Sequence, residues 1–103
     1  MVKQKFGKVV TVSSINAALG VDRDTTYSVA KASVLQLTRS LATEVRKDGI
    51  NVNCIMPGPV RTGRFMATLK GRNSHDLKNL EKKNRLERVA EIEEVASVVE
   101  FLI

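Results

Sequence analysis

The chain contains few of the residues that bind metals or form cross-links. Its 103 residues include one cysteine, one histidine and no tryptophan. Because Cys54 is alone, an internal disulfide is excluded and a reducing, cytoplasmic environment is expected, with Cys54 a small apolar residue of a strand. His75 has no cysteine or carboxylate at the spacing of a metal site, so we expect no metal.

Long apolar runs and aromatic residues are scarce as well. No run of about 18 apolar residues occurs, so no membrane-spanning helix is expected, and the first residues lack a signal-peptide core. Between Arg61 and Arg88 there are nine Lys and Arg against three Asp and Glu, a surplus that equals the whole net charge of +6. Only Phe65 is aromatic in this stretch and no recognition motif is present, so nucleic-acid binding is not expected.

The most informative motif is Tyr27-Ser28-Val29-Ala30-Lys31, with Ser14 13 positions before the tyrosine. On a helix, residues four apart lie on one face, and an ammonium held near a phenol favours the phenolate. The Ser14 hydroxyl can hold a substrate oxygen against that phenol. These side chains predict a proton-transfer site for a carbonyl or an alcohol. The pair alone is also compatible with a half-buried tyrosine beside a solvated lysine.

Two strands and a long helix are predicted around this motif. β-branched residues predict strands at 8–12 and 50–55, and apolar residues at helical spacing predict a helix at 26–47. Asp24 can cap this helix, and Gly49 can end it in a left-handed conformation. Strand, helix and strand in this order form a βαβ crossover, so the two strands should be parallel.

Loops with chemically useful residues follow both strands. Ser14 comes directly after the first strand, and the loop at 56–62 follows the second. In this loop Pro57 restricts the backbone, and Gly58 allows the backbone to approach a ligand closely. The carboxyl ends of parallel strands face the ligand crevice of α/β sheets. Farther along, apolar spacing predicts another helix at 91–102.

Together these motifs resemble the classical branch of the short-chain dehydrogenase/reductase family. The matching segments, in the family's order, are strand 8–12 with Ser14, the Tyr27–Lys31 helix, Gly49–Asn53 with Pro57, Gly58 and Thr62, and the stretch from Arg88 to Leu102. The resemblance covers nearly the whole chain. It implies an α/β fold, the C-terminal part of a Rossmann-like doubly wound parallel sheet, with a βαβ unit and further helices in an incomplete domain.

The resemblance also implies a role for each matching residue. Tyr27 would be the general acid in reduction and the base in oxidation, and Ser14 would hydrogen-bond the substrate carbonyl. Lys31 would bind the ribose hydroxyls of the cofactor and favour the phenolate. The cofactor would be NAD or NADP. The residues implied to bind it are Tyr27, Lys31, Pro57, Gly58, Val60 and Thr62.

Substrate and partners follow from the same resemblance. The substrate would be a small ketone or secondary alcohol, a class that includes 3-oxoacyl compounds. The basic stretch at 61–88 would be a lid, either a solvated segment or an electrostatic funnel for an acidic or carrier-linked substrate. The helix at 26–47 resembles one that packs against a neighbouring subunit, so a homo-oligomer is expected.

Two features depart from the family pattern. The six glycines do not form Gly-x-x-x-Gly-x-Gly, the turn that holds a dinucleotide pyrophosphate, and the sequence ends at Ile103, before the family's last strand. We therefore expect the carboxyl-terminal part of an oxidoreductase. One alternative is a catalytically incompetent fragment that acts only as an interaction or oligomerisation piece. The other is a basic binding module, against which the Tyr27 and Lys31 motif argues.

Overall fold

The computed structural model describes residues 1–22, 24–70, 78–79, 81–82 and 87–103. They form two compact units, Met1–Pro57 with Val98–Ile103 and Gly58–Ser97. His75 and part of the predicted lid at 61–88 lie outside the described residues. Within the described part of the chain, no helix is long and apolar enough to cross a membrane.

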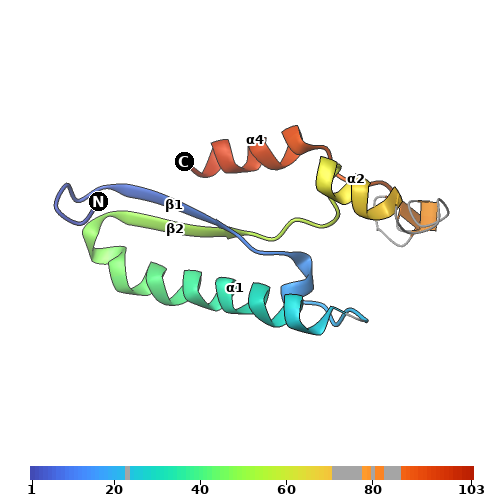
Figure 1. The fold of residues 1–103 in the computed structure, drawn as a ribbon. Coiled ribbons are helices and arrows are strands. Elements are labelled where there is room, and N and C mark those ends of the chain that lie inside the picture. Colours follow the sequence, from blue (N-terminus) through green and yellow to red (C-terminus); the bar gives the residue numbers. More distant parts are fainter. Residues whose placement is uncertain (23, 71–77, 80, 83–86) are drawn as a thin grey trace. The chain divides into compact units, whose positions relative to one another are not determined.

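The first unit is built on a pair of parallel strands, β1 (Gly7–Val12) and β2 (Ile50–Ile55) (Figure 1). The register pairs Gly7 with Ile50 and Val12 with Ile55, so the two strands begin and end together. Valine and isoleucine dominate these segments because branched side chains pack well on a pleated surface. The prediction of an α/β fold with parallel strands is confirmed.

The long helix α1 (Thr25–Val45) connects the two strands and lies along the sheet (Figure 1). Its buried Thr38 meets the strand through a hydroxyl contact of 2.6 Å with Thr11. Asp24 is the N-cap residue, but its side chain makes no capping hydrogen bond and instead accepts one from Asn16 Nδ2 at 3.2 Å. The predicted side-chain cap is therefore wrong, because the Asp24 carboxylate binds the Asn16 side chain instead.

The helix ends differently from the predicted boundary at residue 47. The α-helix stops at Val45, and the 3-10 turn η2 (Arg46–Asp48) completes it. A tighter last turn is common where a helix ends at a glycine, since it satisfies the last carbonyl groups. Gly49 has φ 69°, the left-handed conformation that the sequence predicts.

An ion pair closes the end of η2. The Lys5 ammonium binds the Asp48 carboxylate, whose side chain is 12% exposed. This hydrogen bond is the main cause that lowers the pKa of Asp48 below its ordinary value. The contact joins the segment before β1 to the segment before β2, so it fixes the amino end of the strand pair.

The second unit contains the helix α2 (Gly63–Lys70) and the first turns of α4 (Ile92–Leu102). The side chains of Leu69 and Val89 are buried. An isolated parallel bridge pairs Val60 with Ala90. The helix α2 is not among the predicted elements, and its residues fall inside the predicted lid.

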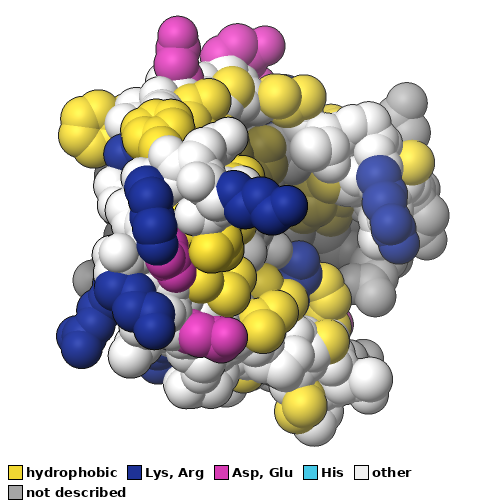
Figure 2. All heavy atoms as spheres, turned by 90° about the vertical axis from the view of Figure 1, so that its left-hand side faces the viewer, with side chains coloured by type: hydrophobic (Ala, Val, Ile, Leu, Met, Phe, Trp, Pro, Cys, Tyr) yellow, Lys and Arg dark blue, Asp and Glu magenta, His cyan; other side chains and the backbone are white. Residues whose placement is uncertain are grey.

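Hydrophobic side chains remain visible at the surface. Figure 2 views the side from which β1 and β2 begin and shows yellow side chains between Lys and Arg. Exposed hydrophobic residues on the described part of the chain include Phe6, and on α1 they include Val29 and Leu37. The small sheet therefore leaves considerable apolar surface in contact with solvent.

Candidate functional site

The carboxyl ends of β1 and β2 are held together beyond the last strand residues. Ser13 N donates to Ile55 O at 2.9 Å, and Ile15 N donates to Pro57 O at 3.0 Å. These bonds continue the pairing into both loops. The loop with Ser14 and the start of the loop with Pro57 are thus adjacent, at the sheet edge where the sequence predicts a ligand.

Ser14 is buried, with 8% of its surface exposed. It caps the short 3-10 helix η1 (Ile15–Ala17), and its Oγ accepts a hydrogen bond from Asn16 N at 3.2 Å. A serine hydroxyl that accepts in this way keeps its own proton to donate. Among the described residues no hydrogen bond joins Ser14 to Tyr27. The Ser14 hydroxyl is thus a donor at this position whose acceptor the structure does not define.

Tyr27 and Lys31 lie together in the first turns of α1. Lys31 Nζ is 5.8 Å from the centroid of the Tyr27 ring, within the range of a cation–π contact. The same ammonium donates to Val12 O at 3.0 Å, at the end of β1. Tyr27 is 47% exposed, so its phenol is open to a ligand. The predicted pairing of these two side chains on one helix face agrees with this geometry.

Ser13 is a residue for which the sequence suggested no role. It is 3% exposed, and its Oγ donates to the backbone carbonyl of Lys31 at 2.7 Å. The available signal is a second hydroxyl directly after a predicted strand. The sequence does not show which turn of α1 meets that hydroxyl, because this depends on how helix and strand pack.

Pro57 belongs to the first unit, whereas Gly58, Val60 and Thr62 belong to the second. Val60 pairs with Ala90, and Thr62 Oγ1 accepts a hydrogen bond from Phe65 N at 3.1 Å. Thr62 therefore caps the first turn of α2, a local role that the sequence did not suggest. Contacts of these residues with a nicotinamide ring stay a prediction.

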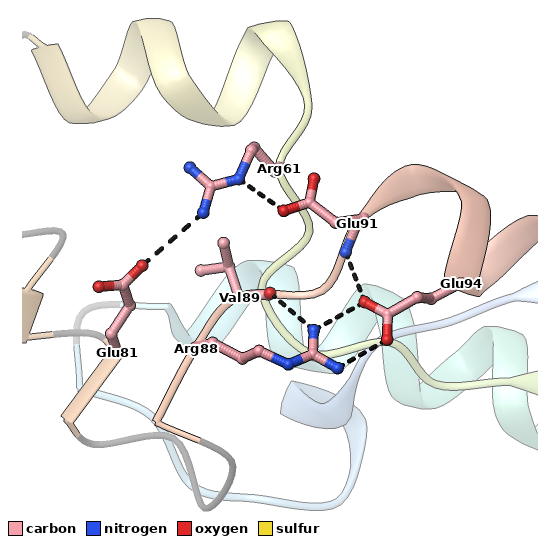
Figure 3. A network of polar contacts seen from close by, with 6 residues as sticks. All are labelled: Arg61, Glu81, Arg88, Val89, Glu91 and Glu94. Atoms are coloured by element: carbon pink, nitrogen blue, oxygen red, sulfur yellow. Dashed lines mark hydrogen bonds and ion pairs between the residues drawn. The ribbon is translucent and has the colours of Figure 1, made fainter.

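Charged side chains form a network of hydrogen bonds and ion pairs around Val89 (Figure 3). Arg61 Nε donates to Glu91 Oε1 at 2.9 Å, and Arg61 Nη2 lies 3.8 Å from Glu81 Oε1. The backbone continues the connection, since Arg61 N donates to Ala90 O at 2.8 Å. This network fixes the segment after Pro59 to the segment before α4.

The carboxylate of Glu94 accepts several hydrogen bonds in the same network (Figure 3). Arg88 donates to both of its carboxylate oxygens, at 2.7 and 2.6 Å, and Glu91 N donates to Oε2 at 2.8 Å. The Arg88 hydrogen bonds, followed by the Glu91 amide, lower the pKa of Glu94 from 4.5 to about 2. A glutamate three residues after the N-cap was a readable signal for this cap, but its pairing with Arg88 was missed.

The described residues offer little for a metal ion. They contain no group of three or more His, Cys, Asp or Glu that could hold one. For a nucleotide, Lys31 can supply donors, because an ammonium has three N–H groups and Val12 O accepts from one of them.

The whole chain is similar to known proteins. Residues 1–103 match the family model described as enoyl-(acyl carrier protein) reductase. The chain is 38% identical over 96 residues to a short-chain type dehydrogenase/reductase of Picea abies, a match over 93% of this chain and 34% of that protein. It is 36% identical over 106 residues to the 3-oxoacyl-acyl-carrier-protein reductase FabG of Buchnera aphidicola, a match over 100% of this chain and 40% of that protein.

A solved structure is similar over the same residues. L-sorbose reductase from Gluconobacter frateurii, complexed with NADPH and L-sorbose, matches with a TM-score of 0.90 and 32% identity, over 99% of this chain and 42% of that chain. The chain thus spans about two fifths or less of the length of these relatives. The resemblance predicted from the motifs is confirmed, and the chain belongs to the short-chain dehydrogenase/reductase family.

Proposed function

We propose that this chain is the catalytic part of an NAD(P)-dependent oxidoreductase, in which Tyr27 exchanges a proton with a ketone or secondary alcohol. The observation that carries the proposal is the position of Lys31 Nζ, 5.8 Å from the Tyr27 ring and bound to the last residue of β1. This places an ammonium beside an exposed phenol at the sheet edge where Ser14 also lies. A phenol beside a cation is suited to general acid–base catalysis.

The residues of the first unit fit a nicotinamide nucleotide. Lys31 retains donors for ribose hydroxyls, because the hydrogen bond to Val12 O uses one of its three N–H groups. When bound, the nicotinamide supplies or accepts a hydride. The family resemblance also implies Pro57, Gly58, Val60 and Thr62 as residues that line the ring, and of these only Pro57 belongs to the first unit. The complex of L-sorbose reductase with NADPH supports a nucleotide of this class.

Each polar side chain of the site has a distinct task in this proposal. Ser14 Oγ donates to the substrate oxygen and orients it. Tyr27 Oη gives its proton to that oxygen in reduction and takes the proton back in oxidation. Lys31 favours the phenolate that forms when the proton leaves. Because Tyr27 is exposed, its proton can also be exchanged with water between turnovers.

The substrate class follows from the relatives and from charge. The names of the FabG relative and of L-sorbose reductase indicate carbonyl substrates of different size, a 3-oxoacyl group and a sugar. Nine basic residues against three acidic ones between Arg61 and Arg88 are compatible with an acidic or carrier-linked substrate and equally with a solvated segment, and two of the nine, Arg61 and Arg88, are paired with Glu91 and Glu94. We propose a small-molecule carbonyl or alcohol as the substrate, with the 3-oxoacyl type as one case.

The test is the Tyr27→Phe substitution in the full-length protein. Phenylalanine keeps the ring beside Lys31 and removes only the proton donor. Turnover should fall by about 10²–10⁴-fold, while titration with NADP or NAD should show nearly unchanged binding. A variant that keeps more than about a tenth of the wild-type rate would exclude Tyr27 as the general acid.

A second candidate function is assembly without catalysis. Val29 and Leu37 are 65% and 61% exposed on α1, an apolar surface that suits contact with another chain. The two candidates differ in cofactor affinity. Saturable binding of a nicotinamide nucleotide that weakens in Lys31→Ala supports the enzyme, whereas association without any such binding supports the assembly role.

A further inference from the structure

Two hydrogen bonds attach Lys31 to the end of β1, one through its backbone carbonyl and one through its ammonium. Its backbone carbonyl accepts the Ser13 hydroxyl at 2.7 Å, and its ammonium donates to Val12 O at 3.0 Å. Val12 and Ser13 are neighbours in the chain, so one short segment at the end of β1 holds both the backbone and the ammonium of Lys31. Ser13 is buried, with 3% of its surface exposed, so this contact is largely shielded from solvent.

The Ser13 contact is not needed to satisfy the helix. Lys31 lies inside α1, where a carbonyl already accepts the amide of the residue four positions later. The Ser13 bond is therefore an additional contact, and it acts on the turn of α1 that carries the lysine. A lysine side chain has many rotamers, so its ammonium stays at a defined position only when its backbone and tip are both fixed.

We propose that Ser13 is a positioning residue that holds the Lys31 ammonium beside the Tyr27 ring. The inference rests on the proposed function, since it concerns the lysine of the proton-transfer site. Without the Ser13 hydroxyl, the turn with Lys31 separates from β1 and the bond from Nζ to Val12 O loosens. The ammonium then spends less time near the phenol and is less well placed for a ribose hydroxyl.

A second contact between the same elements provides the matched control. Thr11 and Thr38 join β1 to α1 through their hydroxyl groups at 2.6 Å, two turns along the helix from Lys31. Thr38 Oγ1 also bonds to Val34 O at 2.8 Å, so it keeps a partner when Thr11 is replaced. Thr11→Val thus removes a strand-to-helix hydroxyl contact without touching the lysine.

The direct test is competitive amine labelling of the chain, with modification of each lysine measured by mass spectrometry. A hydrogen-bonded ammonium reacts slowly, so Ser13→Ala should raise labelling of Lys31 about two- to threefold relative to exposed Lys3 and Lys47. Thr11→Val should leave that ratio unchanged. Ser13→Cys has a side chain of similar size with a weaker donor, so its Lys31 labelling should lie between that of wild type and that of Ser13→Ala. It replaces Ser13→Ala in the comparison if the alanine variant melts below the assay temperature.

A second measurement separates this inference from the proposed function. In the full-length protein, nicotinamide nucleotide binding should weaken strongly in Lys31→Ala, moderately in Ser13→Ala and not in Thr11→Val. If Lys31→Ala binds as well as wild type, the proposed function is wrong. If Lys31→Ala binds weakly but Ser13→Ala matches wild type in both binding and labelling, only the positioning role of Ser13 is wrong.

Discussion

Among the glycines that the structure describes, Gly49 leaves the least room for an added Cβ. Its φ is 69°, and a Cβ at this position would overlap Lys5 O. Gly49→Ala should therefore lower the free energy of unfolding by about 2 kcal/mol, from left-handed backbone strain together with displacement of the Lys5 segment. Chemical denaturation followed by circular dichroism measures the change.

Gly20 is the matched control for this substitution. A Cβ there would meet nothing within 4 Å, and its φ is not in the left-handed region. Gly20→Ala should change the free energy of unfolding by no more than about 0.5 kcal/mol. If Gly49→Ala and Gly20→Ala changed the free energy of unfolding equally, the Lys5 segment would move away from the added Cβ at no cost, and the prediction would be wrong.

Residue-level reasoning from the sequence predicts the pairing of Tyr27 with Lys31 but not the contacts that support it. Tyr27 and Lys31 follow from helical spacing, which is a local property, and Gly49 follows from a local stop signal. Ser13 binds a carbonyl 18 positions away. That contact depends on the rotation of α1 against β1, which no spacing in the sequence determines.

At the level of elements, the start of α4 depends on one carboxylate. Glu94 accepts from Arg88 and from Glu91 N, and its pKa falls from 4.5 to about 2. A group whose pKa is lower in the folded state stabilises the fold above its unfolded pKa and loses this effect as protons bind. Stability of this segment should thus be full above pH 4.5 and decline from there toward pH 2.

Glu94→Gln tests this pH dependence. The variant removes the titrating carboxylate, so the decline of stability between pH 4.5 and 2 should become shallower than in wild type. Glu93→Gln, one position earlier in the first turn, removes a neighbouring charge and serves as control. Thermal melts across this pH range provide the measurement, and parallel curves for wild type and Glu94→Gln would contradict the assigned network.

The elements themselves were predictable to different degrees. β1, β2 and α1 have strong periodicity and clear end signals, so the observed bounds of β2 equal the expected ones and those of β1 and α1 differ from them by one or two residues. The sequence does not predict α2, because its N-cap, Thr62, also matches the cofactor loop of the family. The pairing of Arg61 with Glu91 spans 30 positions, and opposite charges alone do not indicate which pairs form.

At the level of the whole molecule, the described strands form a sheet of only two. A sheet of this size leaves strand edges with unpaired backbone groups, which recruit other strands. Val29 and Leu37 add exposed apolar surface on α1. The 103-residue chain on its own should therefore associate with itself as its concentration rises.

Sedimentation velocity over a range of micromolar concentrations tests this expectation. Replacing Val29 and Leu37 together by serine should shift the distribution toward smaller species, because association through α1 buries these side chains. Val21→Ser, at an exposed apolar residue before α1, should leave the distribution unchanged. Association that survives the double substitution would implicate the strand edges. A single monomeric species with a sharp cooperative melt would instead show that the chain covers its own core, since unpaired edges and exposed α1 residues would then not drive assembly.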